Sequence, residues 1–147
     1  MPLLRGACFS LVYLVAGVSS AVACDCFLPT TQEALHRAHA VFMGTIDQVT
    51  FLDPKDPGSR VIVKFKVARV WKGLVARDFE MRSIVETSMC EGFYRDDLVV
   101  GKKLLVFAHR SEMDSIKTYS TNICTLTGSV EIRRENIKEL GAGVLPL

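Results

Sequence analysis

The chain has 147 residues with 18 basic and 16 acidic side chains, and 49% of its residues are hydrophobic. This length suits one domain, and a formal net charge of only +2 gives no electrostatic basis for binding nucleic acid. The sequence contains no internal repeat and no low-complexity tract.

Residues 1–23 have the features of a secretory signal peptide. Arg5 is the only charged residue among the first 24, an apolar stretch covers residues 8–18, and Ala21 and Ala23 form an A-x-A cleavage site. The apolar stretch is shorter than the roughly 20 residues that span a bilayer. A buried strand or helix of the mature fold is the alternative interpretation. We predict a secreted, periplasmic or extracellular protein whose single domain covers residues 24–147.

Four cysteines remain after cleavage, and an even number in an exported chain predicts two disulfides. They are Cys24, Cys26, Cys90 and Cys124. A Cys24–Cys26 bond would close a tight, strained ring, so we discount that pairing. Either of the other two pairings ties the start of the mature chain to its middle and late parts. Each such long loop contributes about 4 kcal/mol in the chain-entropy model.

The first predicted element is a short helix that follows Pro29 and ends near Ala40. Thr30 and Glu33 have the spacing of a capping box. Apolar residues then recur at helical spacing, at Ala34, Leu35 and Ala38.

Two long strands follow, at residues 41–52 and 60–71, separated by the turn-forming residues 53–59. In the first strand the apolar positions change phase between Ile46 and Val49. In the second they change phase near Ala68 and Arg69. Each change predicts a β-bulge, and bulged, bent strands favour a small closed barrel.

The remaining predicted elements complete a mainly β fold. A third strand covers Phe79–Val85, a fourth covers Lys103–His109 and a fifth covers Lys117–Asn122. A closing helix covers Glu131–Leu140 with Gly141 as its cap. We predict a five-stranded Greek-key barrel of the oligonucleotide/oligosaccharide-binding (OB) type with a short N-terminal helix, a C-terminal helix and two disulfides.

Other residue types that often carry chemistry give weak signals. His36, His39 and His109 are interpreted as surface histidines, because no cysteine or carboxylate cluster joins them at metal-ligand spacing. Trp71 is expected to pack in the core. The chain shows no Ser-His-Asp arrangement, paired carboxylates or phosphate loop, so we expect neither enzymatic activity nor a cofactor.

The mature N-terminus, Cys24-Asp25-Cys26, is the most distinctive motif. With several later stretches it resembles the N-terminal domain of the tissue inhibitors of metalloproteinases, within the wider group of netrin-like modules. The resemblance runs from Cys24 to about Val130. The stretches that carry it are Cys24–Pro29, Ala40–Thr45, Lys64–Val67, Val70–Gly73, Cys90–Phe93, Gly101–Ala108 and Cys124.

The resemblance implies the pairing Cys24–Cys90 and Cys26–Cys124, and a zinc metalloprotease as partner. Inhibitors of this family place the α-amine and carbonyl of the first cysteine on the protease's zinc, at the position kept open for water. An α-amino group has a pKa of about 7.7–8.0, so it loses its proton readily near pH 7. The implied protease-binding residues are Cys24, Asp25, Cys26, Ser88 and Met89, with Cys24 as the metal-binding residue.

Two departures from the family pattern and one competing motif support an alternative. Asp25 stands where the family places an apolar residue in the protease's S1′ pocket, and burying an unpaired carboxylate costs several kcal/mol. His36 stands where a further cysteine is expected. Residues Ala21–Cys24 also weakly resemble a bacterial lipobox, in which Cys24 is lipidated. The alternative is therefore a non-inhibitory, extracytoplasmic netrin-like binding module, which associates with a membrane only if Cys24 is acylated.

Overall fold

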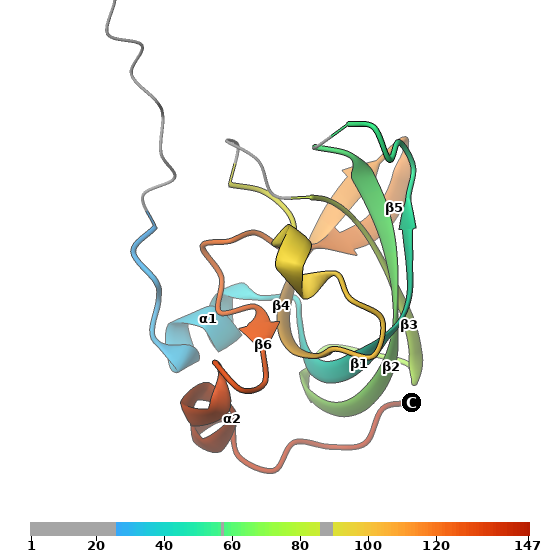
Figure 1. The fold of residues 1–147 in the computed structure, drawn as a ribbon. Helices are drawn as coiled ribbons and strands as arrows, with labels where there is room; N and C mark the ends of the chain where they lie inside the picture. The colour runs from blue at the N-terminus through green and yellow to red at the C-terminus, as the bar shows by residue number, and fades with distance from the viewer. Residues whose placement is uncertain (1–25, 57, 86–89) are drawn as a thin grey trace, which may run out of the picture.

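A computed structural model describes residues 26–56, 58–85 and 90–147 of the chain (Figure 1). The predicted signal peptide lies outside the described residues. The elements, in order, are α1 (Thr31–Arg37), β1 (Ala40–Phe51), β2 (Arg60–Lys72), β3 (Asp78–Ile84), the short 3-10 helix η1 (Arg95–Asp97), β4 (Lys103–Met113), β5 (Ile116–Ser120), β6 (Gly128–Ser129) and α2 (Arg134–Leu140). The prediction of a mainly β fold with two short helices is confirmed.

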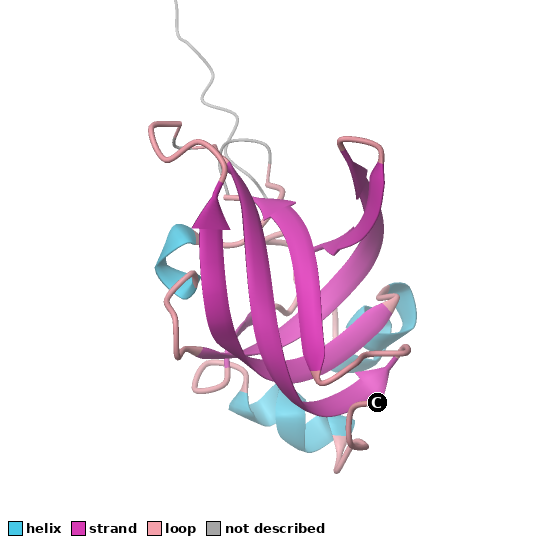
Figure 2. Ribbon diagram, turned by 90° about the vertical axis from the view of Figure 1, so that its right-hand side faces the viewer, coloured by secondary structure: helices cyan, strands magenta, loops and turns pink. Residues whose placement is uncertain are grey.

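The strands form one antiparallel sheet in the order β3-β2-β1-β4-β5, with β6 paired to β4. The sheet is strongly curled (Figure 2), so that its two outer strands approach each other. The Ser83 hydroxyl on β3 lies 2.8 Å from the Ser120 hydroxyl on β5, and the rings of Phe79 and Tyr119 are 5.2 Å apart. Side chains therefore join the two ends of the curled sheet.

Two of the three irregularities between β1 and β2 coincide with the predicted phase changes. Ile46 pairs with Phe65 but Gln48 pairs with Lys64, so Asp47 is an extra residue in β1. On β2, Ala68 is skipped between the partners of Met43 and Gly44. A third shift, at Trp71, was not predicted. Because an extra residue reverses every later side chain, these bulges keep apolar residues on the inner face along both strands.

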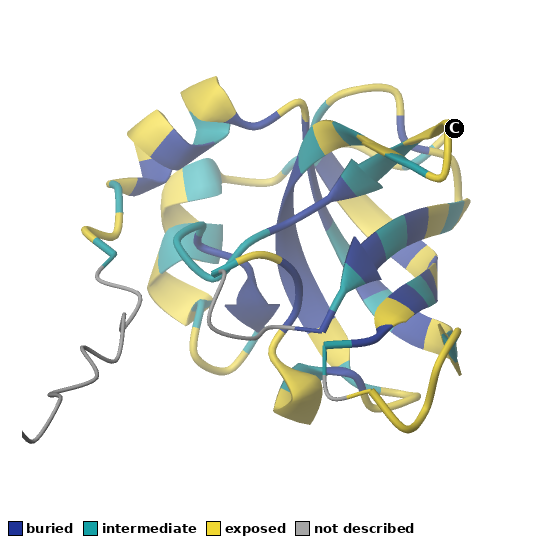
Figure 3. Ribbon diagram, turned by 90° about the horizontal axis from the view of Figure 1, so that it is seen from above, coloured by how far each residue is buried: buried dark blue, intermediate teal, exposed yellow. Residues whose placement is uncertain are grey.

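Strand β4 is buried on both faces, since all five residues from Leu104 to Ala108 are buried. Leu104, Val106 and Ala108 belong to the main core inside the curled sheet, with Phe42 and Phe65. The alternate residues Leu105 and Phe107 belong to a second core beneath α1 and α2. Figure 3 shows that the buried residues of the molecule lie mainly in its strands. The consecutive buried positions of β4 explain why its sequence is a continuous apolar run rather than an alternating one.

Each of the two helices differs from its prediction at one end. The capping box of Thr30 and Glu33 is confirmed, but α1 ends at Arg37. Gly141 caps α2 as predicted, whereas the helix begins at Arg134 because residues 130–133 form turns. Trp71 is half-buried against the second core and donates a hydrogen bond to the Gly141 carbonyl at 3.0 Å. Among the described residues, neither helix has the length and apolar character needed to cross a bilayer.

The strand ends also differ modestly. Strand β4 continues to Met113, four residues past His109, and β5 begins at Ile116 and ends at Ser120. The two-residue β6 was not predicted, because two small residues such as Gly128 and Ser129 carry no strand signal.

The side-chain contact between β3 and β5 predicts an asymmetric response to two substitutions. Ser120→Ala leaves the fully buried Ser83 hydroxyl without a described partner, which should cost about 1–3 kcal/mol of unfolding free energy. Ser83→Ala should cost less, because Ser120 still donates to the Thr121 carbonyl at 3.3 Å. Urea denaturation of both variants and of the double variant measures these values. Equal and additive costs would show that the two hydroxyls do not interact.

Candidate functional site

Only one of the five predicted protease-binding residues, Cys26, lies among the described residues. Cys24, Asp25, Ser88 and Met89 lie outside them. Cys26 forms a disulfide with Cys124, with a Cα–Cα distance of 5.1 Å, so this pairing is confirmed. The Cys24–Cys90 pairing stays a prediction, because Cys24 is not described.

The Cys124 loop pairs with the segment that follows Cys90. Gly92 donates its backbone N–H to the Thr121 carbonyl at 2.9 Å, and Ile123 donates to the Cys90 carbonyl at 3.1 Å. An isolated bridge links Glu91 with Asn122 between them. The Cys26–Cys124 bond therefore brings the N-terminal segment to two loops that are already joined to each other (Figure 1).

The path of the Cys90 loop depends on a glycine. Gly92 has φ +93°, and a Cβ there would lie 1.9 Å from the Ile84 carbonyl oxygen at the end of β3. The next residue, Phe93, donates its N–H to that same oxygen at 3.0 Å and is buried in the main core. Only glycine allows the two backbones to approach this closely.

Three threonine side chains hold the Cys124 loop against β4. Thr127 accepts the Phe107 N–H at 2.9 Å, and Thr121 donates to the Phe107 carbonyl at 3.1 Å. The two hydroxyls lie 2.8 Å apart, and Thr125 lies within 3.1 Å of both. The threonine hydroxyls thus replace a strand as partners for the buried Phe107 backbone. Sequence reasoning missed this cluster, although three threonines around a cysteine were a visible signal.

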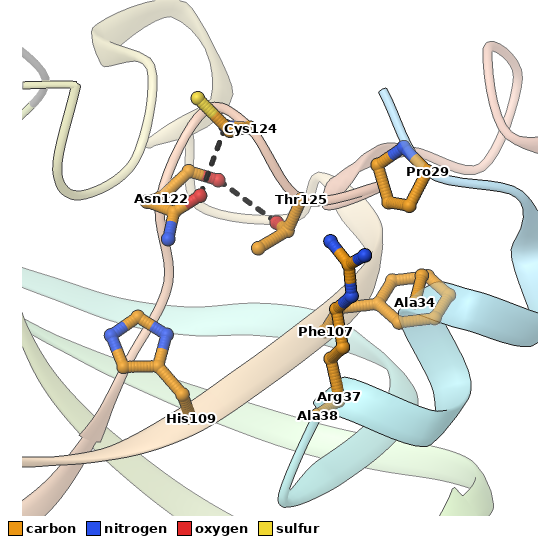
Figure 4. A pocket seen from close by; sticks show the side chains of 9 residues that line it. All are labelled: Pro29, Ala34, Arg37, Ala38, Phe107, His109, Asn122, Cys124 and Thr125. Atoms are coloured by element: carbon orange, nitrogen blue, oxygen red, sulfur yellow. Dashed lines mark hydrogen bonds between the residues drawn. The ribbon is translucent and has the colours of Figure 1, made fainter. Parts of the chain in front are cut away.

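A pocket of about 280 Å³ lies beside this loop, between α1 and β4 (Figure 4). Its lining comes from three parts of the chain: the Pro29–α1 segment, β4 and the Cys124 loop. The lining residues are Pro29, Ala34, Arg37, Ala38, Phe107, His109, Asn122, Cys124 and Thr125. No sequence motif pointed to Arg37 or Asn122, because residues from three separate segments become neighbours only in the folded chain.

The three histidines of the chain form no metal site with the other described residues. His36 is exposed on α1, and the exposed His39 accepts the Arg110 N–H on Nδ1 at 3.3 Å. His109 lines the pocket, with Nε2 4.0 Å from Glu91 Oε2. In the part of the chain that the structure describes, no group of three or more His, Cys, Asp or Glu side chains could hold a metal ion.

Partial burial dominates the electrostatics of His109. Burial lowers the pKa of the His109 imidazole, the Glu91 carboxylate opposes that change, and neighbouring His39 adds to it. Because the net pKa is lowered, the folded protein holds this imidazole neutral at pH values where an exposed histidine already gains a proton.

No protein-family model matches the chain, and no curated protein matches it.

The glycine geometry predicts a large difference between two Gly→Ala substitutions. Gly92→Ala combines a strained positive φ with a backbone clash and should cost about 3 kcal/mol or more. The control is Gly101→Ala, where φ is +87° but no atom lies within 4 Å of the added Cβ, so only the strain of about 1–2 kcal/mol applies. Guanidinium denaturation compares them, and equal costs would contradict the described path of the Cys90 loop.

The lowered pKa of His109 predicts a specific pH dependence of stability. The unfolded imidazole has a pKa of about 6.5, above the folded value, so the unfolded state binds the proton more readily. Stability contributed by neutral His109 should therefore be lost as pH falls through about 6.5 toward the folded pKa. In His109→Gln, this part of the loss between about pH 7.5 and 5 should disappear. An NMR titration should place the His109 pKa below 6.5, and lower still in Glu91→Gln; a pKa above 6.5 would contradict the burial argument.

Proposed function

We propose that the exported protein inhibits a zinc metalloendopeptidase by chelating the protease's zinc through the N-terminal amine and carbonyl of Cys24. The observation that carries this proposal is the Cys26–Cys124 disulfide, which ties the N-terminal segment to a loop hydrogen-bonded to the Cys90 segment. A terminus held in this way loses little further conformational entropy when it enters a partner's active site.

The chemistry requires a free terminus at Cys24. The amine nitrogen and carbonyl oxygen belong to one residue and close a five-membered ring with the metal. They take the coordination position that a catalytic zinc keeps for its water, so the protease loses its nucleophile. A Cys24–Cys90 disulfide would add a second tether two residues before the first, next to Ser88 and Met89.

Apolar side chains beside Cys26 are available to extend such an interface. Phe27 is 94% exposed and Leu28 is 54% exposed, although both are large and hydrophobic. Exposed aromatic and aliphatic side chains next to a rigid anchor are typical of residues that a partner buries.

The proposal includes a closed Greek-key barrel of the OB type as scaffold. The strand order β3-β2-β1-β4-β5 and the side-chain contacts between β3 and β5 support it. In such a barrel, loops at one end present the binding residues while the strands stay rigid.

Asp25 favours the second candidate, a non-inhibitory netrin-like binding module. A carboxylate entering an apolar S1′ pocket has no partner there and loses its hydration, which opposes binding by several kcal/mol. A target protease must therefore offer a cation to Asp25. In a lipoprotein, acylation at Cys24 would consume the thiol and prevent both the Cys24 disulfide and the chelation.

One added alanine before Cys24 tests the mechanism. The extension converts the amine into a peptide nitrogen that cannot chelate, while the Cys26–Cys124 bond and the sheet stay unchanged. Inhibition of a panel of zinc metalloendopeptidases should fall by about 100-fold or more, with thermal stability unaltered as the folding control. Inhibition that survives the extension would rule the mechanism out.

Asp25→Thr separates the two candidate functions. A large gain in metalloprotease affinity, about tenfold or more, would show an inhibitory scaffold with an unfavourable side chain at this position. If Asp25→Thr still shows no measurable affinity for a metalloprotease, the result supports the binding module. Mass spectrometry of the mature N-terminus complements both experiments, since it distinguishes a free amine, an acyl group and a disulfide at Cys24.

A further inference from the structure

The pocket between α1 and β4 combines an apolar floor with a rim of hydrogen-bond donors. Ala34, Ala38, Phe107 and Pro29 supply the apolar surface. In Figure 4 the Arg37 side chain extends along the pocket toward Thr125, and the Asn122 amide lies above the His109 ring. A small-molecule site usually has a mainly apolar lining and a few polar groups, and this pocket has both.

Arg37 supplies a positive charge that the described chain leaves unpaired. No carboxylate among the described residues forms a salt bridge with its guanidinium. Glu33, one turn earlier on α1, interacts electrostatically with Arg37 but forms no salt bridge with it, and its Oε2 accepts from the Thr30 N–H at 2.8 Å and the Thr30 hydroxyl at 2.9 Å. The guanidinium therefore keeps its paired donors for another acceptor.

Asn122 presents a donor because its oxygen is occupied. Asn122 Oδ1 accepts the Cys124 N–H at 3.0 Å, and the Asn122 carbonyl accepts from the Thr125 hydroxyl at 2.8 Å. Asn122 Nδ2 has no hydrogen-bond partner among the described residues, and Figure 4 shows it directed toward the His109 side of the pocket. Asn122 Nδ2 therefore offers a donor on the His109 side of the pocket, and the unpaired Arg37 guanidinium favours an anion on its own side.

The volume and the floor limit the anion to a small one with an apolar body. About 280 Å³ is below the range for drug-sized ligands, and Phe107 and the two alanines, although themselves buried, form an apolar wall that an apolar body would contact. A carboxylate matches the planar fork of an arginine through two parallel hydrogen bonds.

We propose that this pocket binds a small monocarboxylic acid with a compact aromatic or aliphatic body, its carboxylate on Arg37 and its body against Phe107, Ala34 and Ala38. Cys124 is part of the pocket wall, so an occupied site braces the loop that holds the Cys26 disulfide. The inference does not depend on protease inhibition, because every group it uses lies among the described residues.

Benzoate is the probe that tests the proposal, on the oxidised, nitrogen-15-labelled protein isolated after export. Its addition should shift the backbone amides of α1, Phe107 and the Cys124 loop and saturate at millimolar concentration, on the order expected for so small a ligand. Benzamide, which has the same shape without charge, should bind at least tenfold more weakly. Inorganic phosphate, a bare anion, should not compete.

Arg37→Gln should weaken benzoate binding about tenfold or more, and Arg37→Lys should restore part of it. The matched control is Arg69→Gln, an exposed arginine on β2 outside the pocket, which should bind as the unaltered protein does. Thermal unfolding of each ligand-free variant confirms that it folds.

Three results would overturn the proposal: shifts that do not saturate, benzamide binding as tightly as benzoate, or equal binding by Arg37→Gln and Arg69→Gln. Competition by phosphate at equal concentration would also overturn it, because the pocket would then bind anions in general and not carboxylates specifically.

Discussion

The burial of β4 on both faces is the constraint on which the rest of this molecule depends. Leu104, Val106 and Ala108 fill the inside of the curled sheet, while Leu105 and Phe107 form the floor under the two helices. Because one strand belongs to both cores, the helices cannot detach without exposing residues of the sheet. Burying five consecutive apolar residues contributes on the order of 1.5–3 kcal/mol for each large side chain. The same strand contributes Phe107 and His109 to the pocket.

A few short-range contacts hold the loops at one end of the sheet. A disulfide, three threonine hydroxyls and one glycine fix the Cys90 and Cys124 loops to β4 and to the end of β3. None of these contacts requires a long strand or a large apolar side chain. The exposed face of these loops is therefore free to vary in sequence, which is the usual arrangement when a rigid scaffold carries binding residues.

The sequence predicts what depends on periodicity and spacing. The capping box at Thr30, the bulges at Asp47 and Ala68, and the two helices follow from local patterns, and the structure has them. The Cys26–Cys124 pairing came from resemblance, because spacing alone allowed another scheme. The pocket could not be predicted: Arg37, Phe107 and Asn122 are distant in the chain, and no short motif records that folding makes them neighbours. The same holds for β6, whose pairing comes from its position beside β4.

The Cys26–Cys124 bond also determines how the molecule bears mechanical load. The two cysteines are 98 residues apart, and strands β1 to β5 all lie within the covalent loop that they close. Tension between the N-terminal segment and the end of the chain passes through sulfur and bypasses the entire five-stranded path. Of the described residues, only those after Cys124, which include β6 and α2, lie on the path of that tension outside the loop, and they span at most roughly 80 Å when fully extended. A partner that pulls on the N-terminal segment therefore unravels the C-terminal part first and leaves the sheet folded.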